Sequence, residues 1–389
     1  MKKTKKNTKK NTKKNTLKIK RVLSNKSEIE KLTKQYNKSK TKKHAELLKK
    51  TKKIFLYVSK TGATIEDEDT LNRINKLRIP PNYDNVLINT KDTSKLQAIG
   101  YDDKNRKQYI YHKDFILENK LKKYDKYIIL GNYLHKIKKE YMDIITKIQH
   151  KKYSSWNQPE SNSAIILYLL NECLFRIGNM KYYREYSSHG ITTLQRKHIT
   201  FNDEKKIVFI KFVGKKGVIN ESTITNTVFY NIFKTLSKNK TGEFIFDYYD
   251  DTRDEGNQGN RDTHITIVSD DIKKKLYEYN DELTPKMFRT WHTNCYFIHI
   301  LKNNVDNIKN IMKKNKMTKK FKLQLMKNTC IEISLKLHNT ATVIKNSYLN
   351  NALYDLYMNN FEKLIKLLIK CKSLSKEKTL IFIEQYIRK

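Results

Sequence analysis

The hydrophobic pattern changes near residue 120, and this change limits the fold more than any other feature of the sequence. Before it, short β-branched and aromatic runs such as FLYV and QYIYH alternate with turn residues, a pattern typical of strands. After it, apolar residues recur at three- and four-residue spacing through YIILGNYLHKI and NSAIILYLLNECLFRIG, which indicates helices. The sequence therefore predicts an α+β fold, with a small β-rich N-terminal domain over residues 46–122 and a mostly α-helical domain over residues 123–389.

Two segments of the helical part predict local structure in more detail. KKIVFIKFVGKKGVINESTITN alternates like paired strands around GKKG, which predicts a β-hairpin or small sheet with Lys215 at its tip. LTPKMFRTWHTNCYFIHIL predicts a helix with Thr284 as N-cap and Pro285 as first residue. Arg289 lies near its start, beside a predicted apolar stripe. The stripe comprises Phe288, Trp291, Cys295 and Ile298.

The most apolar run, AIILYLLNECLFRI, predicts a core helix that ends with Arg176 just before Gly178. It is too short to cross a bilayer and carries polar residues, so we expect no membrane span. The four cysteines lie far apart without metal-ligand spacing, which indicates buried thiols in a reducing, intracellular compartment. No apolar segment follows the N-terminal lysines, so the sequence predicts no secretory signal.

The chain has a formal net charge of +41, from 81 lysines and arginines against 40 acidic residues. Such an excess favours a polyanionic partner such as nucleic acid, although a lysine-rich proteome is an alternative source.

The repeat MKKTKKNTKKNT predicts a disordered basic arm over residues 1–45. The polar stretch 247–263 predicts a surface loop whose carboxylates lack the spacing of an EF-hand. No GxxxxGKS or GxxxxGKT loop is present, so nucleotide hydrolysis is not supported.

Three cations stand at structurally defined positions: Arg176 at a helix end, Lys215 on a hairpin tip and Arg289 in the first turns of a helix. Each also has a purely structural interpretation. Arg176 could complement a helix dipole or pair with Glu172, Lys215 could be a turn lysine, and Arg289 a solvated charge. Taken singly, none of them identifies a function.

Six strings occur in one order: RIPPNYDNVLI, KLQAIGYDDKNRKQYIYH, LFRIGNMKYYREYSSHGITTLQRKHI, IVFIKFVGKKGV, FRTWHT and NTATVIKNSYLNN. In this order the chain resembles the type IB DNA topoisomerases of the poxvirus and bacterial branch, over roughly residues 70–355. The resemblance implies a catalytic core of the tyrosine recombinase type in residues 123–389. It also implies that the domain over residues 46–122 closes a clamp around DNA.

The resemblance also implies a catalytic set: Arg176, Lys215, Arg289, Asn339 and the nucleophile Tyr348. The two arginines would hold the non-bridging oxygens of a phosphodiester, and Lys215 would protonate the departing 5′-oxygen. A 3′-phosphotyrosyl bond would conserve the energy of the backbone, so neither ATP, a metal nor another cofactor is required. Asn339 stands where poxvirus enzymes have histidine, and the adjoining His338 leaves a second candidate for that position.

In KNRKQYIYH, the resemblance implies base and backbone contacts from Gln108, Tyr109 and Tyr111, with phosphate contacts from Arg106 and Lys107. A sheet face packed by the two tyrosines is the structural alternative. On the helical domain, the resemblance implies DNA contacts from Lys181 and Tyr182. Asn179 stands where the poxvirus pattern has lysine.

The predicted function is relaxation of supercoiled double-stranded DNA by a monomer with no membrane association, in a virus-like setting such as a virion or a viral replication site in the host cytoplasm. The nearest alternative is a tyrosine recombinase or integrase, which shares the arginine, lysine and tyrosine chemistry. A non-catalytic basic DNA-binding protein is a second alternative, and the intact set of Arg176, Lys215, Arg289 and Tyr348 argues against it.

Overall fold

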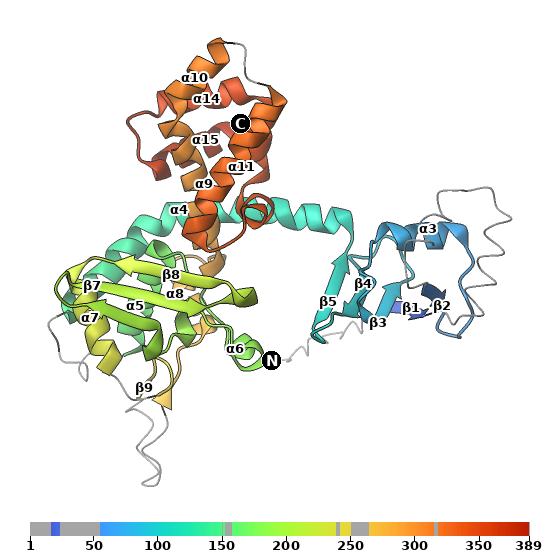
Figure 1. Ribbon diagram of the computed structural model, residues 1–389, viewed down its shortest axis with the longest axis horizontal. Coiled ribbons are helices and arrows are strands. Elements are labelled where there is room, and N and C mark those ends of the chain that lie inside the picture. Colours follow the sequence, from blue (N-terminus) through green and yellow to red (C-terminus); the bar gives the residue numbers. More distant parts are fainter. Residues whose placement is uncertain are drawn as a thin grey trace, which may run out of the picture. The chain divides into compact units, whose positions relative to one another are not determined.

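The computed structural model describes residues 17–23, 55–149, 151, 158–238, 242–249, 264–314 and 318–388 of the chain (Figure 1). The chain divides into two units, Met1–Lys120 and Leu121–Lys389. The boundary between them falls within the long helix α4 (Lys113–Ile148).

The first unit is built on an antiparallel sheet with the strand order β2-β1-β3-β4-β5. Helix α3 (Glu68–Lys76) is capped by Asp67, whose carboxylate accepts a hydrogen bond from the backbone N–H of Thr70 at 2.8 Å. Ile74 of this helix is buried with residues of the sheet, namely Ile19, Val86, Ile88 and Ala98. The strands are β1 (Leu17–Leu23), β2 (Phe55–Val58), β3 (Asp84–Asn89), β4 (Leu96–Tyr101) and β5 (Lys107–Tyr111).

The prediction of a disordered arm over residues 1–45 is wrong for Leu17–Leu23, which form β1 between β2 and β3. The segment LKIKRVL alternates in burial, with Ile19 and Arg21 inside and lysines outside. Arg21 can be buried because it donates to the backbone carbonyls of Pro80 and Tyr83. The high lysine content hid this period-two pattern. The rest of the predicted arm lies outside the described residues.

The second unit is mostly helical, so the predicted α+β fold class is confirmed. A three-stranded antiparallel sheet, β6-β7-β8, lies between its helices in the sequence. Its strands are β6 (Ile199–Asn202), β7 (Ile207–Val213) and β8 (Ile219–Ile224). The helices that follow α4 are α5 (Pro159–Glu172), α6 (Met180–Tyr186), α7 (Thr227–Lys238), α8 (Ser269–Tyr277), α9 (Pro285–Asn303), α10 (Val305–Lys313), α11 (Lys319–Leu337), α12 (Ala341–Val343), α13 (Asn351–Asn359), α14 (Phe361–Lys370) and α15 (Lys376–Ile387).

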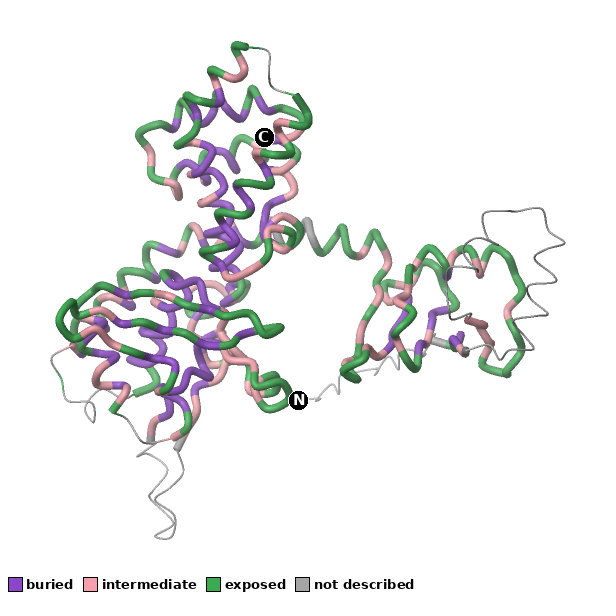
Figure 2. The backbone as a smooth tube through the Cα atoms, viewed as in Figure 1, coloured by how far each residue is buried: buried purple, intermediate pink, exposed green. Residues whose placement is uncertain are grey.

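Helix α9 is the central helix of this unit, and it is buried along most of its length (Figure 2). It begins as predicted, with Thr284 as N-cap and Pro285 at the first helical position. The whole predicted apolar stripe is buried, as are polar residues on the other sides of the helix. The four free cysteines, Cys173, Cys295, Cys330 and Cys371, are buried too, as their spacing predicts.

The predicted core helix is shorter than its apolar run. Helix α5 ends at Glu172, so Arg176 does not lie at a helix end. Leu174 turns the chain with a φ of 54°, and the following residues run extended. The carbonyls of Arg176 and Ile177 accept from the N–H groups of Ile191 and Thr192 at 2.9 and 2.8 Å. These tertiary hydrogen bonds replace the helical ones, which apolar periodicity alone could not reveal.

The predicted loop over 247–263 falls mainly on residues outside the described ranges. Near its start, β9 (Tyr248–Tyr249) pairs with β10 (His264–Ile265), which directly follows the predicted loop. No described helix is long and apolar enough to cross a membrane.

We predict that Gly131→Ala destabilises the protein although alanine favours helices. Gly131 of α4 faces Trp291 of α9, and a Cβ atom there would overlap the indole ring. Overpacking costs roughly 1–3 kcal/mol, which exceeds the roughly 0.5–1 kcal/mol of helix propensity gained. Thermal unfolding should show a lower Tm. Asn132→Ala, on the exposed side of the same turn, should leave the Tm unchanged or raise it.

Candidate active site

Arg289 and Tyr348 form the buried centre of the candidate site. Arg289 Nε donates to the Tyr348 phenolic oxygen at 3.2 Å, and the guanidinium carbon lies 5.4 Å from the tyrosine ring centroid. The other two nitrogens of Arg289 donate to backbone carbonyls, Nη1 to Leu174 and Nη2 to Leu337, the latter at 2.5 Å. Arg289 is only 2% exposed, so these contacts fix the guanidinium and compensate for its lost hydration.

Tyr348 ends a single π-helical turn, Ile344–Tyr348, in which the Leu349 N–H donates to the Ile344 carbonyl at 3.0 Å. Such turns are rare and often occur at functional sites. Burial acts to raise the pKa of Tyr348, but Arg289 opposes it through charge and a hydrogen bond, and Arg176 and Lys286 oppose it through charge. The pKa of the phenol is lowered as a result, which favours the nucleophilic phenolate.

Arg176 and Asn339 meet beside this pair and leave donors unused. Arg176 Nη2 donates to Asn339 Oδ1 at 2.5 Å. Arg176 Nη1 and Asn339 Nδ2 are both buried, yet within the described part of the chain neither finds an acceptor. A buried donor without an acceptor costs about 1–3 kcal/mol, so the arrangement suits a ligand that brings anionic oxygens.

Asn339 and its neighbour His338 have different surroundings. His338 takes a left-handed conformation, with φ 48°, at the end of α11, and its ring lies 5.8 Å from the Phe175 ring. Asn339 is the residue that contacts Arg176. Burial, followed by the Arg289 charge, lowers the pKa of His338, which disfavours a cationic imidazolium here.

Lys215 lies at the tip of the β7–β8 hairpin, as predicted, where the pairing ends at Val213 and Ile219. Partial desolvation lowers the pKa of its ammonium, and the charge of Arg176 lowers it further, whereas Tyr348 acts to raise it. Because the charges of Arg176 and Tyr348 both act on Lys215, the hairpin tip lies in the electrostatic neighbourhood of the buried pair. A lysine with a lowered pKa gives up its proton more easily.

Lys286 is a member of this neighbourhood that sequence reasoning missed. Its charge acts on both Tyr348 and Lys215, although its side chain is exposed. It precedes Arg289 by three residues on α9, which places the two on neighbouring positions of one helical face. That spacing was the available signal in the sequence.

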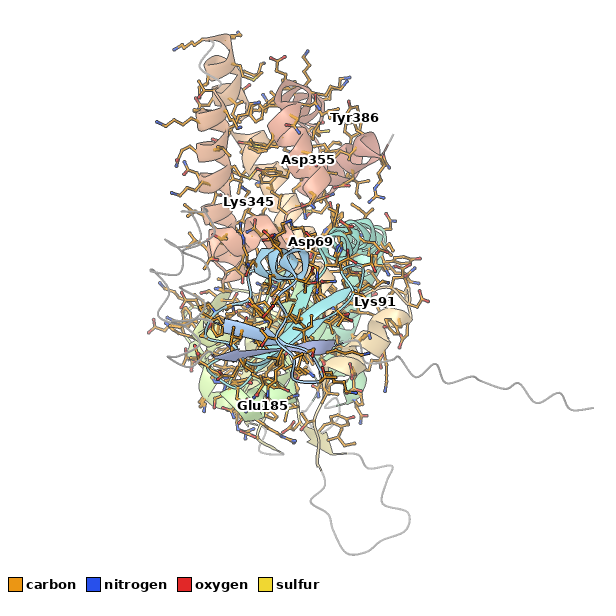
Figure 3. All side chains as sticks on the ribbon, turned by 90° about the vertical axis from the view of Figure 1, so that its right-hand side faces the viewer. Asp69, Lys91, Glu185, Lys345, Asp355 and Tyr386 are labelled. Atoms are coloured by element: carbon orange, nitrogen blue, oxygen red, sulfur yellow. The ribbon has the colours of Figure 1, made fainter. Side chains whose placement is uncertain are left out.

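Helix α6 presents two of the predicted DNA-contacting residues to solvent. Tyr182 is 55% exposed and stacks on Tyr186 with 6.1 Å between ring centroids. Lys181 Nζ lies 3.7 Å from Glu185 Oε1, and Glu185 is labelled in Figure 3. Asn179 caps the helix by accepting from the backbone N–H of Lys181 at 2.9 Å, so its departure from the poxvirus pattern has a structural role.

Strand β5 presents a second exposed aromatic pair in the first unit. Tyr109 and Tyr111 share a face with 6.2 Å between their ring centroids, and Lys107 Nζ lies 5.7 Å from the Tyr109 ring centroid. Arg106 and Gln108 both contact the carboxylate of Asp102, at 2.7 and 2.8 Å. The Arg106 hydrogen bond contributes most to lowering the pKa of Asp102 to about 2, so the pair is charged at neutral pH. Asp102 therefore partly neutralises the positive charge of Arg106, which the sequence did not predict.

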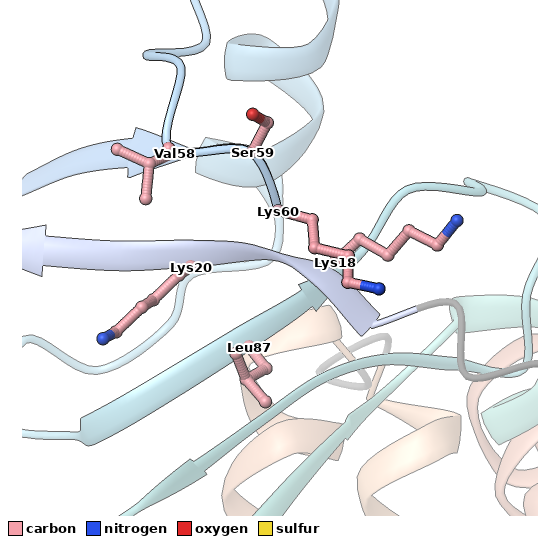
Figure 4. A pocket seen from close by; sticks show the side chains of 7 residues that line it. Lys18, Lys20, Val58, Ser59, Lys60 and Leu87 are labelled. Atoms are coloured by element: carbon pink, nitrogen blue, oxygen red, sulfur yellow. The ribbon is translucent and has the colours of Figure 1, made fainter.

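The first unit also has a pocket lined by lysines. Lys18 and Lys20 of β1 line it together with Lys60 and Ser59, which follow β2 (Figure 4). In Figure 4, Lys20 extends to the opposite side from Lys18. The three ammonium groups therefore do not converge on one point of the pocket.

The described residues contain no cluster of three or more His, Cys, Asp or Glu side chains that could hold a metal ion. The candidate site is thus made of cations, a phenol and an amide. A buried tyrosine beside two arginines and a hairpin lysine is the arrangement that the resemblance to type IB DNA topoisomerases implies. Tyrosine recombinases share these residue types.

Comparison with known proteins distinguishes between these two. Residues 104–373 match the family model of the eukaryotic DNA topoisomerase I catalytic core, and residues 54–102 match that of the bacterial DNA topoisomerase IB N-terminal domain. The chain is 31% identical over 302 residues to DNA topoisomerase 1B of Acanthamoeba polyphaga mimivirus, a match that covers 76% of this chain and 82% of the relative.

More distant relatives agree. DNA topoisomerase 1B of Vaccinia virus (strain Copenhagen) is 28% identical over 189 residues, covering 46% of this chain and 57% of the viral protein. DNA topoisomerase 1 of Schizosaccharomyces pombe is 28% identical over 195 residues, covering 49% of this chain and 20% of the yeast protein. The chain belongs to the type IB DNA topoisomerase family. The predicted family and enzyme class are confirmed, and the recombinase alternative is not supported.

We predict that Lys286→Met raises the pKa of Tyr348, because it removes one of the positive charges that lower it. Phenolate formation is followed by ultraviolet absorbance during a pH titration of each protein. Subtracting the curve of the corresponding protein with Tyr348→Phe leaves the contribution of Tyr348 alone. Lys363→Met, an exposed lysine of α14, is the matched control and should leave the titration unchanged.

The same shift has a consequence for stability. The folded pKa of Tyr348 lies below its unfolded value near 10, so the folding stability that its ionisation contributes is fully present above that value. It is lost as the pH falls through the folded pKa. A Tyr348 pKa at or above 10 in the wild type would contradict the account.

Proposed function

We propose that this chain relaxes supercoiled double-stranded DNA by cutting one strand with Tyr348 and resealing it through a 3′-phosphotyrosyl intermediate. The observation that carries the proposal is the pair of buried, unused donors, Arg176 Nη1 and Asn339 Nδ2, beside a tyrosine whose phenol is held by Arg289. A phosphodiester supplies the oxygens that this pair lacks. Residues 123–389 then form the catalytic domain.

Each catalytic residue has one role in this reaction. The phenolic oxygen of Tyr348 attacks phosphorus, and the bond from phosphorus to the 5′-oxygen breaks. Arg176 and Asn339 bind the non-bridging oxygens on which charge develops. Arg289 stabilises the phenolate through Nε, and its two other nitrogens each keep a second hydrogen for the phosphate.

Lys215 is the proposed general acid. Its lowered pKa and its place at a hairpin tip suit the delivery of a proton to the departing 5′-oxygen. With guanidinium groups at the phosphate and a lysine at the leaving group, the reaction needs neither a divalent metal nor another cofactor. Religation is the reverse reaction, in which Lys215 takes the proton back.

The proposed DNA contacts come from exposed or partly exposed residues of both units. We assign phosphate contacts to Lys107, Lys181 and Arg106, with Arg106 weakened by Asp102. Tyr109, Tyr111 and Tyr182 offer exposed rings to sugars and bases, and Gln108 offers an amide. We expect residues 46–122 to act as the clamp domain, and a monomer to suffice because the donor set is complete within one chain.

We predict relaxation of both positively and negatively supercoiled plasmid in EDTA without ATP. Denaturant added during the reaction should trap a covalent protein–DNA adduct. Tyr348→Phe should abolish the adduct and reduce relaxation by at least about 10³-fold, while duplex binding stays within about threefold because the ring remains. Tyr354→Phe, on the neighbouring α13, is the matched control. A wild type that binds DNA but forms no adduct would favour the binding-only alternative.

We predict that Lys215→Ala slows cleavage by about 10²–10⁴-fold, the usual contribution of a general acid. A substrate with sulfur in place of the bridging 5′-oxygen should restore most of the rate, because a thiolate leaves without a proton. Lys216→Ala, on the same tip, should cleave both substrates nearly as the wild type does. Equal losses on both substrates would exclude the acid role of Lys215.

A further inference from the structure

A buried carboxylate on the last helix lies at one end of a hydrogen-bond chain that leads to Tyr348. Glu384 of α15 is 2% exposed, and its Oε1 accepts from the Tyr127 hydroxyl at 2.5 Å and from Asn350 Nδ2 at 2.7 Å. Arg388 Nε lies 3.8 Å from its Oε2. Helix α15 follows the residues matched by the catalytic-core model, which end at 373.

The hydrogen-bond chain from Glu384 continues through two buried asparagines, Asn350 and Asn294. The backbone N–H of Asn350 donates to Asn294 Oδ1 at 2.9 Å. Asn294 Nδ2 donates in turn to the Tyr348 carbonyl at 3.0 Å and to the Thr290 carbonyl at 2.8 Å. Asn294 thus holds the peptide groups on both sides of Leu349, directly after the nucleophile.

Helix α9 holds Tyr348 at two points as a result. Arg289 binds the phenolic oxygen, and Asn294, five residues later on the same helix, binds the main-chain carbonyl. Asn350 connects this arrangement to Glu384, and its side chain also caps α13 by accepting from the Ala352 N–H at 3.0 Å. A fully satisfied buried network of this kind specifies one conformation.

Packing alone does not account for a carboxylate at this position. Leu380 and Ile383 of α15 are completely buried and dock the helix by apolar contact. A buried carboxylate is costly unless hydrogen bonds compensate for its lost hydration. Here those bonds are directed to the segment that carries Tyr348 and to Tyr127 of α4, so the carboxylate determines where that segment lies.

We propose that Glu384 is a positioning residue for the cleavage reaction, which holds Asn350 and thereby the phenolic oxygen of Tyr348 in line with the scissile phosphate. The inference rests on the proposed function of Tyr348 as nucleophile. A displacement of about 1 Å of a reacting group can cost about 10²-fold in rate. Loss of Glu384 therefore affects the chemical step and leaves DNA binding intact.

The test uses the full-length chain and single-turnover cleavage of a duplex. Glu384→Ala should lower the cleavage rate by about 10- to 100-fold, with a Kd for duplex within about twofold of wild type. Leu380→Ala removes buried apolar contact from the same helix without touching the network, and it is the matched control for destabilisation. At a temperature where thermal melts show both variants folded, it should cleave within about threefold of wild type.

A pair of milder variants keeps the test decisive if Glu384→Ala does not fold. Asn350→Asp preserves the acceptor for the Ala352 N–H but removes the donor that faces Glu384, so its cleavage should slow. Adding Glu384→Gln supplies a side-chain amide at position 384, which can donate a hydrogen bond to the new carboxylate at position 350. The double variant should cleave at least about tenfold faster than Asn350→Asp alone, because the effects of substitutions at directly bonded residues are not additive.

Two results would overturn the positioning role of Glu384: equal rate losses in Leu380→Ala and Glu384→Ala, or no recovery in the double variant. Failure of the proposed function looks different. In that case the Tyr348→Phe variant would still form the covalent adduct, whatever residue occupies position 384.

Discussion

The buried guanidinium of Arg289 is the interaction on which the rest of the site depends. It joins three separate parts of the chain: the Leu174 carbonyl after α5, the Leu337 carbonyl at the end of α11, and the phenol of Tyr348. Arg176 follows the first of these points by two residues, and Asn339 follows the second by two. One cation thus holds the backbone two residues before Arg176 and two residues before Asn339, and it contacts the phenol of Tyr348 directly. A charge at 2% exposure is costly to bury unless each nitrogen is satisfied, which explains why the surrounding backbone converges on it.

The electrostatics of the site follow from this geometry. Arg289, Arg176 and Lys286 together outweigh the effect of burial on Tyr348 and lower its pKa. Burial lowers the pKa of Lys215, and the charge of Arg176 lowers it further. A phosphodiester entering the site would relieve both the repulsion among these charges and the unused donors of Arg176 and Asn339. The net charge of +41 adds a long-range attraction for DNA, which salt screens, whereas the buried contacts are screened much less.

Much of this could be predicted from the sequence wherever local pattern and tertiary structure agree. The α9 stripe, its Thr284 and Pro285 start, and the hairpin with Lys215 at its tip all have short-range signals that the structure confirms. The failures occur where long-range contacts dominate. Leu17–Leu23 become a strand because two neighbouring strands pair with them, and the residues after Glu172 leave the helix to bond with residues 191 and 192. The pairing of Arg106 with Asp102 and the link from Glu384 to Asn350 likewise join side chains whose orientation no periodicity reveals. The resemblance to a family supplied the site residues, and the structure supplied their contacts.

The most direct test of the account is to identify the amino acid that becomes attached to DNA. A cleavage reaction on duplex DNA is stopped with denaturant, the protein is digested, and the DNA-linked peptide is sequenced by mass spectrometry. The account predicts a single linked peptide from the segment NTATVIKNSYLNN, with the 3′-phosphate on Tyr348 and a free 5′-hydroxyl on the other strand end. Attachment through any other residue, or through a 5′-phosphate, would contradict it.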